Sequence, residues 1–214
     1  MKQVLIAGAT GLIGSKAGRL ALADERFTKV ISISRKPLGL DHPKLEQWCA
    51  NDLLSGLRPQ HVDAVICCLG TTMRNVGGDK TKFIHVDKDL VLGLARWAKS
   101  QGVPLFAVVS AIGADPASRI FYNRVKGEME MGLKAIDLPT LHIFQPSILT
   151  GPRSEQRFGE RAGIAVMRLI SALLPSRYKP MPHDVLAKAM LNSVFASKGG
   201  THQFAAIRAL AARN

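Results

Sequence analysis

The stretch Gly8-Ala9-Thr10-Gly11-Leu12-Ile13-Gly14 decides the fold of this chain, because it joins two segments of different periodicity. The segment before it, residues 3–8, is a continuous apolar run of strand length. The segment after it, residues 12–24, repeats its apolar residues at helical spacing. Glycines at such a junction let the backbone turn sharply, so the sequence predicts a strand, a tight turn and a helix in immediate succession.

The same alternation continues along the chain. Further runs of strand length lie at 29–34, 64–69, 104–110 and 140–146, and helical periodicity is found at 80–101 and 118–136. The runs lack the in-and-out alternation of half-exposed strands, which is typical of parallel strands covered by helices on both faces. The sequence therefore predicts an α/β fold, a doubly wound parallel sheet of the Rossmann type.

The character of the sequence changes after residue 150. We expect a charged loop over 151–163, an apolar helix ending at Leu174, a further helix from Asp184 to Phe195 and a short C-terminal helix. At 214 residues and 47% hydrophobic, the chain is long enough for one substantial core and too short for two. We expect a single domain, residues 1–214, with a small C-terminal lobe for substrate or partner over 151–200.

The composition argues against several classes of protein. No apolar run approaches the roughly 20 residues that cross a bilayer, so we expect no membrane span. The formal net charge of +13 is dispersed, so nucleic acid is not an expected partner. The three cysteines and six histidines lack the spacing of disulfide frameworks or metal sites. We therefore expect a cytoplasmic protein without a metal, either a monomer or a homodimer.

A glycine turn at the start of a helix is suited to binding a pyrophosphate. The three glycines let the backbone come close to the ligand, and negative charge is stabilised by the free N–H groups and the positive end of the helix dipole. The amides of Leu12 and Ile13 are the expected donors, with Thr10 beside them. The alternative is a glycine-rich turn that binds no ligand.

The end of the second strand indicates which dinucleotide would bind. An NAD-preferring site carries Asp or Glu about 20 residues after the last glycine. Here Ser34, Arg35 and Lys36 occupy that place, and no acid is present. A guanidinium pairs bidentately with phosphate, so we expect Arg35 to hold the 2′-phosphate of NADPH, with Ser34 as a hydroxyl donor and Lys36 as further charge. The alternative is that Arg35 is an ordinary solvated cation.

Two further segments are candidates for binding the rest of the cofactor. Asp52 follows the expected third strand, where its side chain would bind the adenine amine, although Asx residues in such places are also turn formers. Leu69, Gly70 and Thr71 follow the fourth strand, where the backbone would pass beneath the riboses. The two cysteines just before them are expected in the core.

Tyr122 and Lys126 are the candidate catalytic pair. They are four residues apart in the helix after the fifth strand, so both project from one face toward the carboxyl edge of the sheet. A tyrosine, with its ordinary pKa of about 10, is useful near neutrality only when a cation stabilises its phenolate, and Lys126 is placed to supply that charge. Ser110 is the candidate for polarising a substrate carbonyl.

These segments together resemble the short-chain dehydrogenase/reductase superfamily and, within it, the atypical, Tat-interacting-protein-like group. The resemblance covers most of the chain. It is carried by the glycine stretch 8–14, Cys68-Leu-Gly-Thr-Thr72, Val86-Asp87, Ser110-Ala-Ile-Gly-Ala-Asp115, Tyr122-Asn-Arg-Val-Lys-Gly-Glu128, Pro146-Ser-Ile-Leu149 and Ala189-Met-Leu-Asn192.

The resemblance implies that the glycine turn, Arg35 and the loop 69–71 hold NADPH. It also implies that Pro146 and Ile148 lie against the nicotinamide ring, next to the tyrosine and lysine. The chain departs from the family in one respect: where these enzymes often carry paired hydroxyls, Ser110 is followed by an alanine. Members of the group are better known as cofactor-binding proteins with regulatory partners than for defined substrates.

Other polar residues receive a structural interpretation. Asp87 opens a turn of helix, where the macrodipole favours a carboxylate. Asp184 is the expected N-cap of a helix that begins at Val185. Three arginines at four-residue spacing within 153–161 either meet an anionic substrate or partner or face solvent.

Two functions remain open from the sequence. The first is an NADPH-dependent oxidoreductase acting on a small-molecule carbonyl or alcohol, with Tyr122 as the proton donor and Lys126 as the ribose ligand. The second is a redox-sensing regulatory protein in which NADPH reshapes the loop 151–163 for a protein partner, without turnover.

Overall fold

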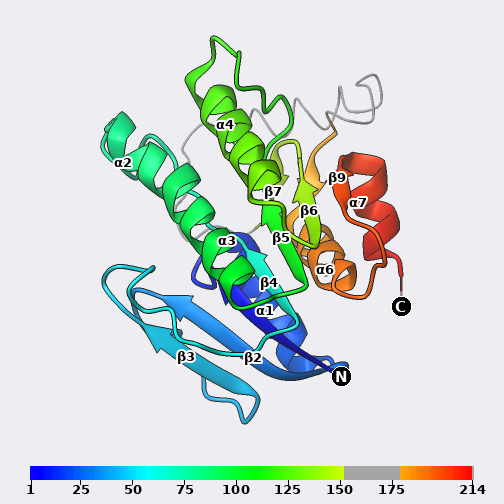
Figure 1. The fold of residues 1–214 in the computed structure, drawn as a ribbon. Coiled ribbons are helices and arrows are strands. Elements are labelled where there is room, and N and C mark those ends of the chain that lie inside the picture. Colours follow the sequence, from blue (N-terminus) through cyan, green and yellow to red (C-terminus); the bar gives the residue numbers. More distant parts are fainter. Residues whose placement is uncertain (152–178, 214) are drawn as a thin grey trace.

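Strands and helices alternate along the chain (Figure 1). The structure, a computed structural model, describes residues 1–151 and 179–213. The strands are β1 (Lys2–Ala7), β2 (Phe27–Ser34), β3 (Leu45–Cys49), β4 (Ala64–Cys67), β5 (Leu105–Val109), β6 (Thr140–Phe144), β7 (Leu149–Thr150), β8 (Met181–Pro182) and β9 (Gly200–His202). The helices are α1 (Leu12–Ala23), α2 (Lys80–Ile84), the π-helix η1 (His85–Asp89), α3 (Leu90–Ser100), α4 (Phe121–Ile136), α6 (His183–Ser193) and α7 (Phe204–Ala211).

Seven strands form one sheet in the order β3-β2-β1-β4-β5-β6-β9, and every pair in it is parallel. The chain order reverses at β1, with β2 and β3 on one side and β4 onward on the other. In open parallel sheets, ligands bind at the carboxyl ends of the strands beside such a reversal. The predicted α/β, doubly wound parallel fold is therefore confirmed, and the topology identifies the edge where a site is expected.

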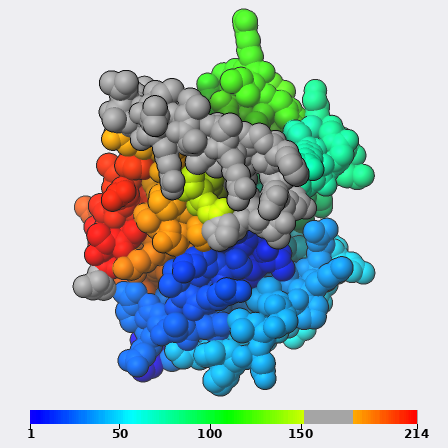
Figure 2. Space-filling view, turned by 180° about the vertical axis from the view of Figure 1, so that it is seen from behind, coloured from blue at the N-terminus to red at the C-terminus, as the bar shows by residue number. Residues whose placement is uncertain are grey.

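Helices cover both faces of the sheet (Figure 1). Val4 and Ile6 of β1 face a core shared with α1, α6 and α7. Leu5 and Ala7 face a second core shared with α3 and α4. Successive residues of a strand point to opposite faces, so one apolar run supplies both cores. Figure 2 shows the blue N-terminal residues beside the orange and red C-terminal residues on the first of these faces.

The expected strands are found with their ends shifted by two residues or fewer. The seventh strand, β9, was not expected, because it is three residues long and begins with Gly200 and Thr201, so it has no apolar run. The helix expected over 118–136 begins at Phe121. The expected capping role of Asp184 is wrong: α6 begins at His183 after Pro182, so Asp184 lies in the first helical turn. The macrodipole favours a carboxylate there as well.

The helix expected over 80–101 contains a π-helical turn, η1, between α2 and α3. Of the apolar face expected from the sequence, Leu90 and Leu94 are buried and Val86 and Trp97 are partly buried. Phe83, Asp87 and Val91 are buried as well. Asp87 lies four residues after Phe83 and three before Leu90, so it shares the inward face of these helical turns. Only 1% of its surface is exposed.

The C-terminal residues after 180 share the core of the sheet. Asn192 of α6 accepts a hydrogen bond from Arg26 at 2.9 Å and donates to the carbonyls of Leu210 and Arg213 at 3.0 and 2.7 Å. This buried amide therefore ties α6 to the turn before β2 and to the C-terminal end of α7. None of the described helices has the length and apolar composition that crossing a membrane requires.

Part of the expected C-terminal lobe falls on residues 152–178, which lie outside the described residues. These include all of the charged loop 151–163 except Gly151, the apolar helix ending at Leu174, and the three arginines within 153–161. The lobe boundary at 151–200 stays a prediction.

Candidate functional site

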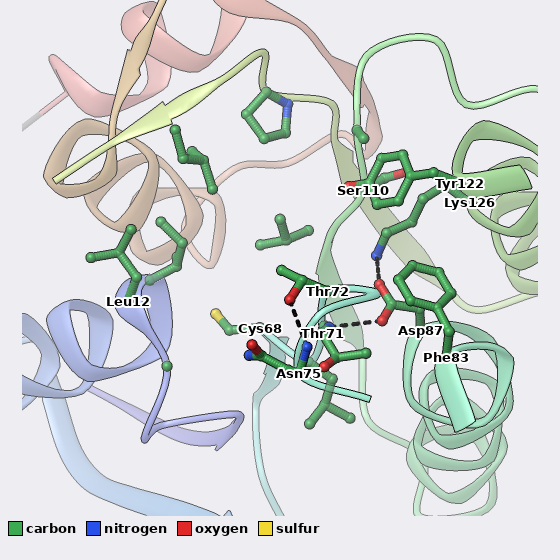
Figure 3. Close-up of a pocket in the computed structure, with 18 of the residues that line it drawn as sticks. Leu12, Cys68, Thr71, Thr72, Asn75, Phe83, Asp87, Ser110, Tyr122 and Lys126 are labelled. Carbon is green, nitrogen blue, oxygen red and sulfur yellow. Dashed lines mark hydrogen bonds and ion pairs between the residues drawn. The ribbon is translucent and has the colours of Figure 1, made fainter. Parts of the chain in front are cut away.

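A pocket of about 970 Å³ lies at the carboxyl edge of the sheet (Figure 3). It is lined by the glycine turn and the start of α1, the loop 68–75 after β4, Phe83, Asp87, the segment 109–112, Tyr122, Lys126 and the segment 146–149. The figure shows Leu12 on one side, Tyr122, Lys126 and Asp87 on the other, and Cys68, Thr71 and Thr72 between them. Side chains from distant parts of the sequence therefore meet at one cavity.

Twelve of the residues expected to form the site line this pocket. They are Thr10, Gly11, Leu12, Ile13, Leu69, Gly70, Thr71, Ser110, Tyr122, Lys126, Pro146 and Ile148. Six expected site residues lie outside the lining of the pocket: Gly8, Gly14, Ser34, Arg35, Lys36 and Asp52.

The two outer glycines shape the turn without touching the cavity. Gly8 has a φ of +81°, and a Cβ there would lie 2.7 Å from the carbonyl oxygen of Cys68. A Cβ on Gly14 would lie 2.2 Å from the carbonyl oxygen of Gly8, which also accepts a hydrogen bond from the Gly11 amide at 2.9 Å. Only glycine permits both approaches, so these residues hold the first strand, the turn and the loop after β4 together.

The start of α1 fits an anionic ligand. Its N-cap is Gly11, which has no side chain to accept from the first amides, and its first turn contains no acidic residue. The first N–H groups of a helix need acceptors from outside the helix. The amides of Leu12 and Ile13 border the pocket, so a pyrophosphate placed there would find donors and the positive end of the helix dipole.

The end of β2 carries the expected basic residues at the surface. Arg35 and Lys36 are both exposed, whereas Ser34 is 5% exposed. The Ser34 hydroxyl donates to the carbonyl oxygen of Lys36 at 2.7 Å. In this arrangement the two cations are accessible to a phosphate, while the expected hydroxyl donor is used within the turn.

Asp52 forms a turn in this structure. Its carboxylate accepts from the amide of Ser55 at 3.0 Å, and its carbonyl oxygen accepts from the Ser55 hydroxyl at 2.8 Å. This is the turn-forming behaviour that the sequence left as the alternative. Contact with an adenine amine stays a prediction for Asp52.

The cysteines at the end of β4 are free thiols in apolar surroundings. Cys67 is fully buried in the core with α3 and α4, and Cys68 lines the pocket. Burial raises the pKa of Cys67 to about 12 and also raises that of Cys68. Both thiols therefore stay protonated near neutrality, and neither is an activated nucleophile.

Lys126 forms a buried ion pair with Asp87. Its Nζ lies 2.9 Å from Asp87 Oδ1, and the two side chains are 4% and 1% exposed. Burial acts against the charge of Lys126, but the attraction of Asp87 outweighs it, so the pKa of Lys126 is raised. The other oxygen, Asp87 Oδ2, accepts from the amide of Thr71 at 2.8 Å. Asp87 therefore joins the lysine of α4 to the loop expected to hold the cofactor.

Asp87 is the site residue whose part the sequence analysis missed. It was interpreted as a carboxylate favoured by the helix dipole, but its charge instead faces a lysine inside the pocket. Its spacing from Phe83 and Leu90 indicates a carboxylate on the apolar face of the helix, but spacing alone does not identify its partner. The available signal was the motif Val86-Asp87, which was noted as part of the family resemblance without a role for its carboxylate.

Tyr122 lies beside this ion pair. It is 40% exposed, and its ring centroid is 5.9 Å from that of Phe83. Loss of solvent around its hydroxyl raises the pKa of Tyr122; the positive charge of Lys126 lowers it, and the negative charge of Asp87 raises it further. The net effect favours the protonated tyrosine.

Ser110 is linked to a buried carboxylate. Its hydroxyl donates to Glu130 Oε1 at 2.5 Å, and Gln145 Nε2 donates to the same carboxylate at 2.9 and 3.1 Å. Gln145 in turn accepts from Gln203 at 3.0 Å. Because the Ser110 proton is directed at Glu130, its oxygen presents lone pairs to the pocket, and polarisation of a carbonyl by Ser110 would require that proton to turn away.

Residues 1–151 and 179–213 contain no group of three or more His, Cys, Asp or Glu side chains arranged to hold a metal ion.

Comparison with known proteins identifies clear relatives, although no protein-family model matches the chain. The chain is 33% identical over 205 residues to protein HTATIP2 of Rattus norvegicus, covering 93% of this chain and 84% of that protein. It is also 33% identical over 164 residues to the mitochondrial protein FMP52 of Eremothecium gossypii, covering 76% and 73% of the two chains.

Solved structures support the fold at lower identity. WbmH of Bordetella bronchiseptica, solved in complex with NAD⁺, matches with a TM-score of 0.66 and 18% identity, covering 99% of this chain and 79% of that one. MoeE5, solved with UDP-glucuronic acid and NAD, matches with a TM-score of 0.70 and 16% identity, covering 93% and 74%. These similarities establish the Rossmann architecture.

The cytoplasmic location expected from the sequence is contradicted by the relatives. The FMP52 proteins of Eremothecium gossypii and of Emericella nidulans are both named as mitochondrial. The expectation rested on cysteine usage, and free thiols are compatible with any reducing compartment, so they do not distinguish one such compartment from another.

Proposed function

We propose that this chain, which belongs to the family of protein HTATIP2 and the FMP52 proteins among the short-chain dehydrogenase/reductase-type Rossmann proteins, is an NADP(H)-dependent oxidoreductase. The observation that carries the proposal is the position of Tyr122 and Lys126, which face the glycine turn across one pocket (Figure 3). A proton donor and a dinucleotide site must share a cavity for hydride transfer to a carbonyl.

Each part of the pocket suits one part of the dinucleotide. The amides of Leu12 and Ile13 would hold the pyrophosphate, and the loop 69–71 would pass beneath the riboses. Pro146 and Ile148 line the same pocket, where they would exclude water from the nicotinamide ring. When bound, the nicotinamide supplies a hydride to a carbonyl carbon or accepts one from an alcohol.

The chain's own residues would move the proton. Tyr122 would donate the proton of its hydroxyl to the developing alkoxide, and Lys126 would hold the ribose hydroxyls nearby. Ser110 would polarise the carbonyl only after its hydroxyl proton turns from Glu130 toward the substrate. In this assignment Tyr122 is the group that a turnover assay must test.

The preference for NADP(H) over NAD(H) rests on the end of β2. Arg35 and Lys36 are exposed there, and no acid follows the strand in the position that binds the 2′-hydroxyl of NAD. WbmH and MoeE5 were solved with NAD, so a preference for NADP(H) would distinguish this chain from them.

The test is titration of the purified protein with NADPH and with NADH, followed by nicotinamide fluorescence. Arg35→Ala should weaken NADPH binding about tenfold or more, the value of a charge-assisted hydrogen bond, and should leave NADH binding within about twofold. Arg96→Ala is the matched control, because Arg96 is an exposed cation on α3 away from the pocket. No binding of either nucleotide would refute the proposal.

A second candidate function is favoured by one observation. The charge of Lys126 is paired with Asp87, and the proton of Ser110 is paired with Glu130. An ammonium and a hydroxyl that are already bound to carboxylates within the protein suit a protein that binds NADPH and responds to it without turnover. Tyr122→Phe distinguishes the two functions: an oxidoreductase loses turnover with a panel of carbonyl compounds and keeps its affinity, whereas a sensor shows no NADPH consumption before or after the change.

A further inference from the structure

The charge of Lys126 is balanced by a buried carboxylate at the wall of the pocket. The ammonium and the carboxylate of Asp87 are 2.9 Å apart, and both side chains are almost completely buried. Asp87 is held from its other side by the amide of Thr71 at 2.8 Å. The carboxylate therefore has two fixed donors, and the position of the ion pair is set by three elements: η1, α4 and the loop after β4.

Among residues 1–151 and 179–213, few charged groups face Tyr122. Lys126 lies one helical turn further along α4, Asp87 lies on η1, and the remaining charged residue that lines the pocket is Arg74, which is exposed in the loop after β4. From α2 the neighbour is the uncharged ring of Phe83. Within the described part of the chain, the balance of charge near the tyrosine therefore depends mainly on Lys126 and Asp87.

An unpaired ammonium stabilises a phenolate, whereas a close ion pair does so far less, because its two fields oppose one another. The same opposition is seen in the effects on the pKa of Tyr122, which Lys126 lowers and Asp87 raises. A tyrosine with a high pKa is present in its protonated form, and an alkoxide is basic enough to take that proton. The phenolate that would remove a proton from an alcohol is then rarely present near neutrality.

We infer that Asp87 is a positioning residue that holds Lys126 in an ion pair and so keeps Tyr122 protonated, which suits the site to carbonyl substrates rather than to alcohols. This inference rests on the proposed function. In the favoured step, the carbonyl carbon receives a hydride from NADPH, which is oxidised to NADP⁺. The π electrons of the C=O bond move to oxygen, the Tyr122 O–H bond breaks, and its proton goes to that oxygen. Solvent then returns a proton to the phenolate.

The test is a direct titration of Tyr122 in the protein without cofactor. The chain has two tyrosines, so Tyr178→Phe leaves Tyr122 as the sole source of phenolate absorbance. In this background Asp87→Asn should raise the acid dissociation constant of Tyr122 about tenfold or more. Asp89→Asn is the matched control, because Asp89 is an exposed carboxylate on the same π-helix, and it should leave the titration unchanged.

A double variant keeps the test decisive if Asp87→Asn folds poorly. Asp87→Asn with Lys126→Gln replaces the ion pair by two neutral amides, so no uncompensated charge is left buried. The titration of Tyr122 should then stay close to that of the parent. A rise in its pKa of about one unit or more would mean that Lys126 acts on Tyr122 despite Asp87, and would overturn the inference.

The two proposals fail in different measurements. If the single variant Asp87→Asn folds and Tyr122 titrates as in the parent, the inference is wrong even when NADPH binds and carbonyls are reduced. If Tyr122 responds as expected but no nucleotide binds, the proposed function fails and the charge coupling stands. If the charge coupling and the proposed function both hold, Asp87→Asn should increase NADP⁺-dependent alcohol oxidation near neutrality relative to carbonyl reduction.

Discussion

Mild acid should destabilise this protein through a buried histidine pair. His142 of β6 is fully buried, and its Nδ1 lies 2.8 Å from Nε2 of His202 on β9. The two rings are stacked, with centroids 5.1 Å apart. Burial, with the nearby His202, lowers the pKa of His142 from 6.5 to about 4, and burial also lowers that of His202. Protonation of this pair is therefore strongly opposed by the fold.

The sign and size of the effect follow from linkage. Below pH 6.5 the unfolded chain binds a proton at this position more readily than the folded one, so stability falls as the pH falls. For a pKa of about 4 in the folded state, the free energy of unfolding drops by about 2 kcal/mol between pH 7.5 and pH 5 and by about 3 kcal/mol at pH 4. The full contribution is present above the unfolded pKa.

In the described residues, the carboxyls with shifted pKa values titrate mostly below this pH range. The carboxyls of Asp24, Glu46 and Asp63 have lowered pKa values in the folded protein, so their contributions are lost only as the pH falls below their ordinary values of 3.8 to 4.5. Measurements between pH 7.5 and pH 5 therefore report mainly the histidines.

The assay is urea unfolding followed by tryptophan fluorescence across this pH range. His142→Gln removes the titrating ring and keeps a hydrogen-bonding group beside His202, so its stability should depend less steeply on pH than that of the parent. His85→Gln, at an exposed histidine, is the control and should keep the parental slope. The reasoning is refuted if the parent loses less than about 0.5 kcal/mol by pH 5, or if His142→Gln loses as much as the parent.

Three further predictions concern the pocket. Gly14→Ala brings a Cβ to 2.2 Å from the Gly8 carbonyl oxygen, so it should lower the melting temperature and abolish nucleotide binding; unchanged nucleotide affinity would contradict this. Lys126→Met leaves a buried Asp87 without its partner and should cost about 3–5 kcal/mol in urea unfolding, with a loss under about 1 kcal/mol arguing against a tight pair. Ser110→Ala removes one donor from the buried Glu130 and should cost about 1–3 kcal/mol, and equal stability of variant and parent would count against that bond.

Much of the fold could be predicted because its signals are local. Continuous apolar runs such as Val4 to Ala7 indicate a strand covered on both faces, and the glycines at 8, 11 and 14 indicate a turn that no other residue makes. The pair Tyr122 and Lys126 was found from their four-residue spacing on one helix. The short strand β9 escaped notice, because it gains its place by pairing with β6 and not from its own composition.

The sequence by itself determined the parallel α/β order, the glycine turn and the residues that could carry chemistry, since backbone freedom and hydrophobic periodicity depend on near neighbours in the chain. Only the tertiary structure decided which polar groups meet: Asp87 of η1 pairs with Lys126 of α4, and Glu130 accepts the hydrogen bond of the Ser110 hydroxyl. Electrostatic partners are chosen by distance in space and by burial, and both arise only when separate helices are packed against one sheet.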